Sequence, residues 1–133
     1  GELIKTLEGH PGHPYEDDDE YFSVMSVSFH PSGDVLASGG GDGKIKLWNV
    51  ETGELIKTLK GQSGVCHSVS FHPSGDVLAA GVGNKIKLWN VKTGELIKTL
   101  EGQSGGCHSV SFSPSGDVLV AGQDFAMGVY KSL

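Results

Sequence analysis

The sequence reads KIKLWNV at residues 44–50 and GELIKTL at residues 53–59, and it repeats this pair almost letter for letter at residues 85–91 and 94–100. The second half of the pair also opens the chain at residues 1–7. A fixed period of this kind is the signature of a repeat array, in which each copy folds as one unit and packs on its neighbours. The chain is therefore expected to consist of stacked copies of one structural unit.

Each copy carries the pattern of four short strands. Residues 24–29 place apolar Val24, Val27 and Phe29 around small polar residues, which is typical of a strand with one buried face. A turn containing Pro and Gly follows at residues 30–34 and leads into a second apolar run, so these two strands form a hairpin. The whole unit takes about 42 residues, with antiparallel strands expected at residues 24–29, 35–38, 44–50 and 54–59.

The second copy follows the same plan, and the third begins with it. The third copy then departs, because residues 126–132 read AMGVYKS where the others have KIKLWNV, and no fourth strand follows. The first copy is longer, since GELIKTL begins at residues 1, 53 and 94. This difference predicts an inserted loop at residues 11–21. The remaining strands are expected at residues 66–71, 77–80, 85–91, 95–100, 107–112 and 118–121.

A Gly-His dipeptide, Gly9-His10, precedes the first strand of the first copy, and an aromatic residue near the end of each third strand recurs with this period; the aromatic residues are Trp48, Trp89 and Tyr130. In these features the chain resembles the WD-repeat β-propeller family, in which each four-stranded unit is one blade. The resemblance implies an all-β fold and a single three-blade segment over residues 1–133. Its expected parts are an outer strand at 1–8, blade 1 at 9–59 with the insertion at 11–21, blade 2 at 60–100, and blade 3 at 101–133 without its fourth strand. Copies so similar indicate an array that was amplified recently in nature or assembled by design.

The resemblance also implies a buried polar tetrad of His, Ser or Thr, Asp and Trp. Blade 1 matches all four positions with His10, Ser38, Asp42 and Trp48. Blade 2 has lost the Asp and its partner together, which is expected because a half-satisfied buried network is costly. Blade 3 keeps only Asp124 beside an altered set. The substituted positions are Gln62, Ala80 and Gly83 in blade 2, and Gln103, Ala121 and Tyr130 in blade 3.

Three blades cannot close a ring, since propellers typically have about four to eight. A lone chain would leave apolar blade faces and a sheet edge open. We therefore expect a homo-oligomeric ring, in which the first strand of each chain completes the last blade of the next. WD-type rings usually have about seven or eight blades, so neither a dimer with six blades nor a trimer with nine has the usual number. The trimer is slightly favoured. The exchanged strand comprises Glu2, Leu3, Ile4, Lys5, Thr6 and Leu7.

Charge and composition exclude several kinds of partner. The formal net charge is −6, and no basic stripe is present that could neutralise phosphates, so nucleic acid is not an expected partner. No apolar run approaches the length of a membrane span. The two cysteines, Cys66 and Cys107, occupy the same place in successive copies and are expected to be reduced, which fits a cytoplasmic location.

No catalytic site is expected. His10 and His13 lie beside an acidic run and could in principle hold a metal ion, but the loop lacks a calcium-loop pattern, and a solvated acidic loop is favoured. His30 and His72 become Ser113 in the third copy, so they are interpreted as surface turn residues without a shared role. We expect no cofactor and no resident metal. The acidic run is Glu16, Asp17, Asp18, Asp19 and Glu20.

Two functions remain open. The first is a non-enzymatic structural scaffold that assembles itself into a symmetric ring by strand exchange. The second is an interaction module that presents the acidic loop and the propeller face to a protein or peptide. The turns of the copies are nearly identical, which favours the first, whereas the insertion alone favours the second.

Overall fold

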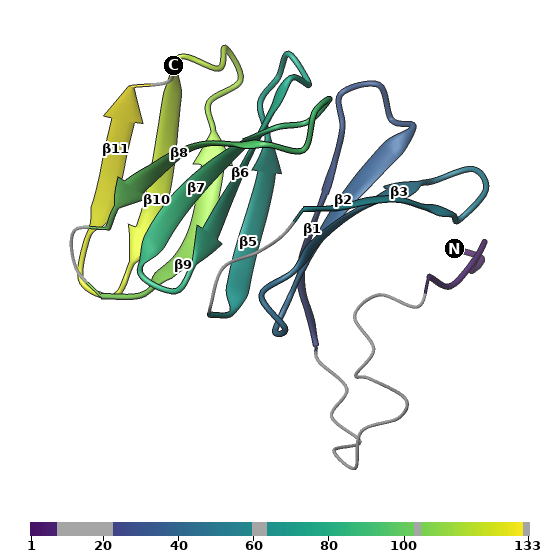
Figure 1. Cartoon of the computed structure of the whole chain (residues 1–133), viewed down its shortest axis with the longest axis horizontal. Helices are drawn as coiled ribbons and strands as arrows, with labels where there is room; N and C mark the ends of the chain where they lie inside the picture. Colours follow the sequence, from purple (N-terminus) through teal and green to yellow (C-terminus); the bar gives the residue numbers. More distant parts are fainter. Residues whose placement is uncertain (8–22, 60–63, 103–104, 132–133) are drawn as a thin grey trace.

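A computed structural model describes residues 1–7, 23–59, 64–102 and 105–131, which form eleven strands in three separate antiparallel sheets (Figure 1). Blade 1 comprises β1 (Val24–Phe29), β2 (Val35–Gly40), β3 (Ile45–Asn49) and β4 (Leu55–Leu59). Blade 2 comprises β5 (Cys66–Phe71), β6 (Val77–Val82), β7 (Lys85–Asn90) and β8 (Leu96–Glu101). Blade 3 comprises β9 (Cys107–Phe112), β10 (Val118–Gln123) and β11 (Met127–Lys131).

Within each sheet the strands pair in chain order, as expected for successive hairpins. The turn between the first two strands is the same in all three blades, and its Gly adopts a positive φ of 80° at Gly33 and 82° at both Gly75 and Gly116. That conformation is open to Gly but strained for residues with a Cβ. The recurrent Pro-Ser-Gly-Asp turn therefore sets the same register in each blade.

The blades pack side by side through their first strands, β1 against β5 and β5 against β9. Blade 2 lies in the middle, and Figure 1 shows blades 1 and 3 on either side of it. Because blade 2 is covered on both faces, its residues supply ten of the nineteen buried hydrophobic side chains in the described residues, including Trp89, Leu78 and Ile86. The core therefore lies between blades and not within one.

The outward face of blade 1 is open. Val27 and Phe29 of β1 are 59% and 61% exposed, whereas the matching Val69 and Phe71 of β5 are 4% and 7% exposed. The free edge of blade 3 is similarly open, with Met127 and Val129 of β11 at 76% and 70%. The two ends of the array thus expose apolar groups that the middle of the array buries.

The outer strand expected at residues 1–8 belongs to the last blade of another copy, so a single chain does not test it. Residues 1–7 form no strand, and Leu3 and Ile4 are 82% and 90% exposed. A strand needs a partner edge to satisfy its amides and carbonyls, and this segment pairs with none of the three described sheets of its own chain. The all-β fold with three antiparallel units is confirmed, whereas completion of a ring stays a prediction. The described part of the chain includes no helix that could cross a membrane.

Candidate functional site

The first seven residues lie on blade 1 in the way that β4 lies on blade 2. In β4, Lys57 donates from Nζ to the carbonyl of Lys92 at 2.8 Å, and Lys57 and Leu59 approach the turn glycine Gly94. A Cβ placed on Gly94 would lie 3.1 Å from Lys57 Cδ and 3.4 Å from Leu59 Cδ2. These contacts define how the outer strand of one blade touches the next blade.

The N-terminal segment repeats every one of these contacts on blade 1. Lys5 donates from Nζ to the carbonyl of Glu51, and a Cβ on Gly53 would lie 3.5 Å from Lys5 Cδ and 3.2 Å from Leu7 Cδ2. Glu51 and Gly53 hold the same places in blade 1 that Lys92 and Gly94 hold in blade 2. Residues 1–7 therefore occupy the position of the outer strand of a blade that would precede blade 1. Figure 1 shows this purple segment beside blade 1, far from β11.

The expected polar tetrad of blade 1 is partly described. Trp48 donates its indole Nε1–H to Ser38 Oγ at 2.9 Å, and both residues are buried. Asp42 Oδ1 accepts the backbone N–H of Lys44 at 3.0 Å. His10 lies outside the described residues, so the complete tetrad stays a prediction. In blade 2, Ala80 stands opposite Lys87 where Ser38 stands opposite Lys46, and it offers no hydroxyl to Trp89.

The altered third strand of blade 3 changes two residues together. In blade 1 the Lys46 ammonium lies 6.0 Å from the centre of the Trp48 ring. In blade 3 the corresponding residues are Gly128 and Tyr130, and a Cβ on Gly128 would lie 2.7 Å from the tyrosine ring. The ring thus covers the space that a side chain at residue 128 would need. The Tyr130 hydroxyl donates to the carbonyl of Glu101 in blade 2 at 3.4 Å.

The turn histidines have a structural role that the sequence interpretation missed. His30 Nδ1 accepts the N–H of Ser32 at 3.0 Å, so Nε2 carries the proton and donates to the carbonyl of Gly75 in blade 2 at 3.2 Å. The His30 ring also meets Phe71 of blade 2 edge-on, with centroids 5.2 Å apart. The interpretation of His30 and His72 as turn residues without a shared role is therefore wrong.

His72 repeats this bridge from blade 2 to blade 3. Its Nε2 donates to the carbonyl of Gly116 at 3.1 Å, and its ring centroid lies 5.0 Å from that of Phe112. The recurrence of His directly after the closing Phe of the first strand was the signal available in the sequence. Ser113 stands at this position in blade 3.

Both cysteines are free and fully buried between blades. Burial raises the pKa of Cys66 from its ordinary value of 9.0 to about 12, and burial also raises the pKa of Cys107. A thiol that stays protonated is a poor nucleophile. Neither residue is therefore suited to catalysis.

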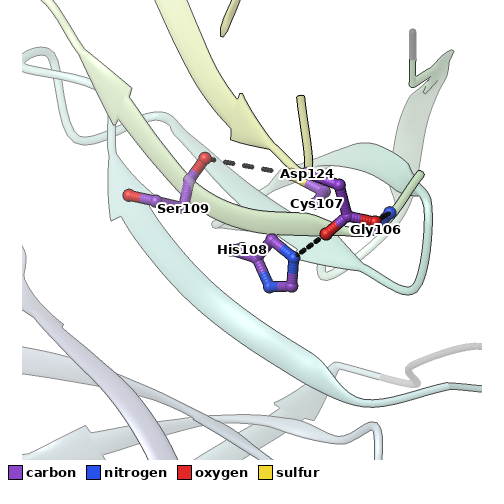
Figure 2. Close-up of polar contacts among 5 residues, drawn as sticks. All are labelled: Gly106, Cys107, His108, Ser109 and Asp124. Atoms are coloured by element: carbon purple, nitrogen blue, oxygen red, sulfur yellow. Dashed lines mark hydrogen bonds and ion pairs between the residues drawn. The ribbon is translucent and has the colours of Figure 1, made fainter. Parts of the chain in front are cut away.

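The neighbouring histidines lie on a different face. The rings of His67 and His108 lie 5.4 Å apart across the boundary between blades 2 and 3. His108 Nε2 hydrogen-bonds to Asp124 Oδ1, while Asp124 Oδ2 accepts the N–H of Gly106 at 2.9 Å (Figure 2). The hydrogen bond from His108 holds the pKa of Asp124 below its ordinary value. Asp124 therefore ties the end of β10 to β9. Gln103 of the blade 3 set lies outside the described residues, so that set stays a prediction.

Metal binding finds no support in the described part of the chain, which contains no group of three or more His, Cys, Asp or Glu side chains able to hold an ion. His10, His13 and the acidic run at residues 16–20 lie outside the described residues. Their proposed roles stay predictions.

Comparison with known proteins agrees with this geometry. The model of the family described as "WD domain, G-beta repeat" matches residues 1–49, 53–90 and 94–130. Nuclear distribution protein PAC1 of Tuber melanosporum is 54% identical over 41 residues, which cover 31% of this chain and 9% of that protein. Eukaryotic translation initiation factor 3 subunit I of Scheffersomyces stipitis is 40% identical over 65 residues, which cover 49% of this chain and 16% of that protein.

A third relative, antiviral protein SKI8 of Saccharomyces cerevisiae, is 56% identical over 36 residues, which cover 27% of this chain and 9% of that protein. The matches thus span between 9% and 16% of the length of these three relatives. Each family match begins at a GELIKTL segment and continues through the first three strands of one blade, so the second and third matches each start with the outer strand of the preceding blade. The chain therefore belongs to the WD-repeat family, whose β-propellers generally serve as non-enzymatic scaffolds for protein interaction.

Proposed function

We propose that this chain is a self-assembling structural scaffold, in which copies close into a symmetric propeller by exchanging their N-terminal strands. Residues 1–7 of one copy form the outer strand of blade 3 of another copy. The proposal rests on the position of this segment against blade 1, where Lys5 and Leu7 repeat the contacts that Lys57 and Leu59 make with blade 2.

The segment needs only a sheet beside it to become a strand, and β11 provides an edge of the required kind. In blades 1 and 2 the third strand pairs with the fourth in one register, with Ile45 opposite Leu59 and Ile86 opposite Leu100. Transferred to the exchanged strand, this register places Leu7 opposite Met127 and Lys5 opposite Val129. Main-chain pairing of this type adds a strand to an open edge without requiring a preformed pocket.

Exposure supports the same arrangement. The counterparts of Leu3 and Ile4 are Leu55 and Ile56 in β4, at 47% and 50% exposed. Pairing with β11 would therefore bring Leu3 and Ile4 from 82% and 90% to about the exposure of β4 residues. It would also cover an unpaired edge, which otherwise invites indiscriminate association.

Closed rings of two or three copies contain six or nine blades, and we propose the nine-blade trimer. The repeated blade-to-blade contact requires each copy to present the same pair of unlike surfaces, one at each end. A head-to-tail contact of this kind closes into a ring when its rotation is a whole fraction of a turn.

The test replaces Leu3 and Ile4 together by Asp and measures the mass of the assembly by native mass spectrometry. We expect the wild-type trimer to give way to monomer, because two carboxylates beside β11 disfavour strand pairing. The matched control carries Leu96→Asp and Ile97→Asp in β8, which are 43% and 45% exposed in the equivalent strand of blade 2. The control is expected to keep the wild-type copy number. Normal assembly of the variant carrying Leu3→Asp and Ile4→Asp refutes strand exchange.

A second function is kept because the family is one of protein-interaction scaffolds. In it, the acidic run at residues 16–20 recognises a basic segment of another protein. Deletion of residues 11–20 would then abolish binding to a lysine-rich peptide but leave the ring intact. Loss of the ring on deletion would instead assign the loop to the boundary between copies.

A further inference from the structure

The two boundaries between blades inside the chain are built from the same two sets of contacts, and the two open ends of the array carry the residues for one more such boundary. The first contact is a notch, meaning the space left in one blade by a glycine without a side chain. A Cβ placed on Gly39 in β2 would lie 2.5 Å from Cys66 Sγ, so the thiol of blade 2 fills the space that the glycine leaves in blade 1. Gly81 and Cys107 repeat this fit between blades 2 and 3, at 2.7 Å. Both cysteines are 0% exposed.

The second contact is made by a pair of serine hydroxyls. Ser26 Oγ accepts the N–H of Val69 at 3.1 Å, and Ser28 Oγ accepts the N–H of Phe71 at 3.3 Å. The next boundary repeats both bonds one blade further on, from Val110 N–H to Ser68 Oγ at 3.1 Å and from Phe112 N–H to Ser70 Oγ at 3.4 Å. Each blade thus supplies one notch and two acceptors to the blade that follows it.

Blade 3 carries the accepting half of such a boundary, and no described residue fills it. Gly122 pairs with Ser109 in the same register in which Gly39 pairs with Ser26 and Gly81 with Ser68. The nearest described atom to a Cβ on Gly122 is Ser109 Cβ of its own blade, at 3.7 Å. Ser109 and Ser111 are exposed, whereas Ser68 is only 9% exposed.

Blade 1 carries the entering half. Val24 stands opposite Gly40 as Cys66 stands opposite Val82 and Cys107 opposite Gln123, so Val24 is the structural counterpart of the two buried cysteines. It is 48% exposed where they are 0% exposed. Valine is apolar and of similar bulk to cysteine, which suits it to the same kind of notch.

We propose that blade 1 of one copy docks face to face on blade 3 of another, with Val24 in the notch at Gly122. The amides of Val27 and Phe29 donate to Ser109 Oγ and Ser111 Oγ across this seam. The inference rests on the proposed ring and specifies which side chains meet at its boundary. A second copy of this chain is the occupant because the two open halves are the unlike halves of the contact that the chain already makes twice internally.

The seam places two residues close enough to be cross-linked. In the internal boundaries, a Cβ on Gly39 lies 3.4 Å from Cys66 Cβ, and a Cβ on Gly81 lies 3.3 Å from Cys107 Cβ. These separations are close to the ~3.5–4.5 Å between the Cβ atoms of a disulfide. The double variant Val24→Cys, Gly122→Cys should therefore form a disulfide between copies when two thiols lose their hydrogens to added diamide. Gly122 lies in β10 and tolerates a side chain because no described atom crowds its Cβ position.

The control variant pairs Val24→Cys with Asp117→Cys, an exposed residue that precedes the opposite end of β10. Five steps along the extended chain separate Asp117 from Gly122, a distance of roughly 16 Å, which is beyond the reach of a disulfide. On non-reducing gels we expect most chains of the variant with Val24→Cys and Gly122→Cys to run as one closed covalent ring and the control to run as single chains. Each variant's mass is measured before oxidation.

The outcomes separate the two proposals. A ring that assembles by mass but does not cross-link through residues 24 and 122 overturns the seam and leaves the strand exchange standing. Equal cross-linking in the control overturns the seam as well, since it would show no preferred register. A chain that stays monomeric before oxidation overturns both.

Discussion

Replacement of His72 by Ser in blade 2 would copy the residue that blade 3 already has at position 113. His72 donates from Nε2 to the carbonyl of Gly116 at 3.1 Å and meets the Phe112 ring edge-on at 5.0 Å. Its ring is held in place by the N–H of Ser74, which donates to Nδ1 at 3.0 Å. The shorter serine side chain loses both contacts with blade 3.

The expected loss follows from these two contacts. A net contribution of about 0.5–1.5 kcal/mol for the hydrogen bond and about 0.5–1.5 kcal/mol for the edge-on ring contact gives roughly 1–3 kcal/mol of unfolding free energy. Urea unfolding of the wild type and His72→Ser at one protein concentration measures this difference, with equal slopes expected for both chains. The concentration is fixed because assembly itself adds to apparent stability.

A double-mutant cycle with Phe112→Leu isolates the ring contact, since the hydrogen bond to Gly116 survives that change. We expect the cost of His72→Ser to be smaller when Phe112 has been replaced. A cost below about 0.5 kcal/mol for His72→Ser in the wild type would refute the role of this bridge between blades. The reverse change, Ser113→His, should strengthen the boundary between copies and shift dissociation of the ring to higher dilution.

Three further predictions concern buried and charged groups. Ser38→Ala should cost about 1–2 kcal/mol of unfolding free energy, because the buried indole N–H of Trp48 loses its acceptor; an unchanged urea midpoint would contradict this. The thiol of Cys66 should resist iodoacetamide in the folded chain at pH 8 and react after unfolding. Because burial raises its pKa to about 12, its contribution to the stability of the fold is intact below pH 9.0 and is lost as pH rises towards 12. For Asp124, whose pKa is lowered, the pH dependence has the opposite sign: the stabilising hydrogen bond with His108 is complete above about pH 4 and is lost as pH falls through the lowered pKa. Asp124→Asn should therefore flatten the acid limb of the curve of unfolding free energy against pH. Identical curves for the variant and the wild type would show that the pair contributes nothing.

The sequence predicted the blades because period, turn chemistry and strand pattern agree. The Pro-Ser-Gly-Asp turn and the alternating run at residues 24–29 point to the same hairpin, and β1 and β2 lie where they were expected. Local signals of this kind are strong because they act within a few residues of each other. The sheet of blade 3 has three described strands, as expected for a copy in which residues 126–132 form an altered third strand and no fourth strand follows.

The contacts between blades were much harder to predict. His30 lies in a turn and looks like a surface residue, yet its partner Gly75 is 45 residues away. The fit of Cys66 against Gly39 is equally invisible in the sequence, because only the register of the sheets brings the sulfur to the glycine. A pattern within one repeat shows which face is buried but not which atoms of the next repeat cover it.

The N-terminal segment also shows that a pattern within one repeat does not reveal which part of the structure it contacts. Its similarity to β4 predicted a strand, and the described chain instead holds residues 1–7 as a segment outside the three sheets, at the outer-strand position on blade 1. Strand formation depends on a partner edge, and the sequence of the segment alone does not supply one.

The central claim is that the open ends of this three-blade array are the two halves of one contact between copies. Native mass spectrometry of the unmodified chain at micromolar concentration tests it most directly, since the number of copies is read from the mass alone. The account predicts one closed species of three chains that persists on dilution. A folded chain that remains a single copy would contradict it.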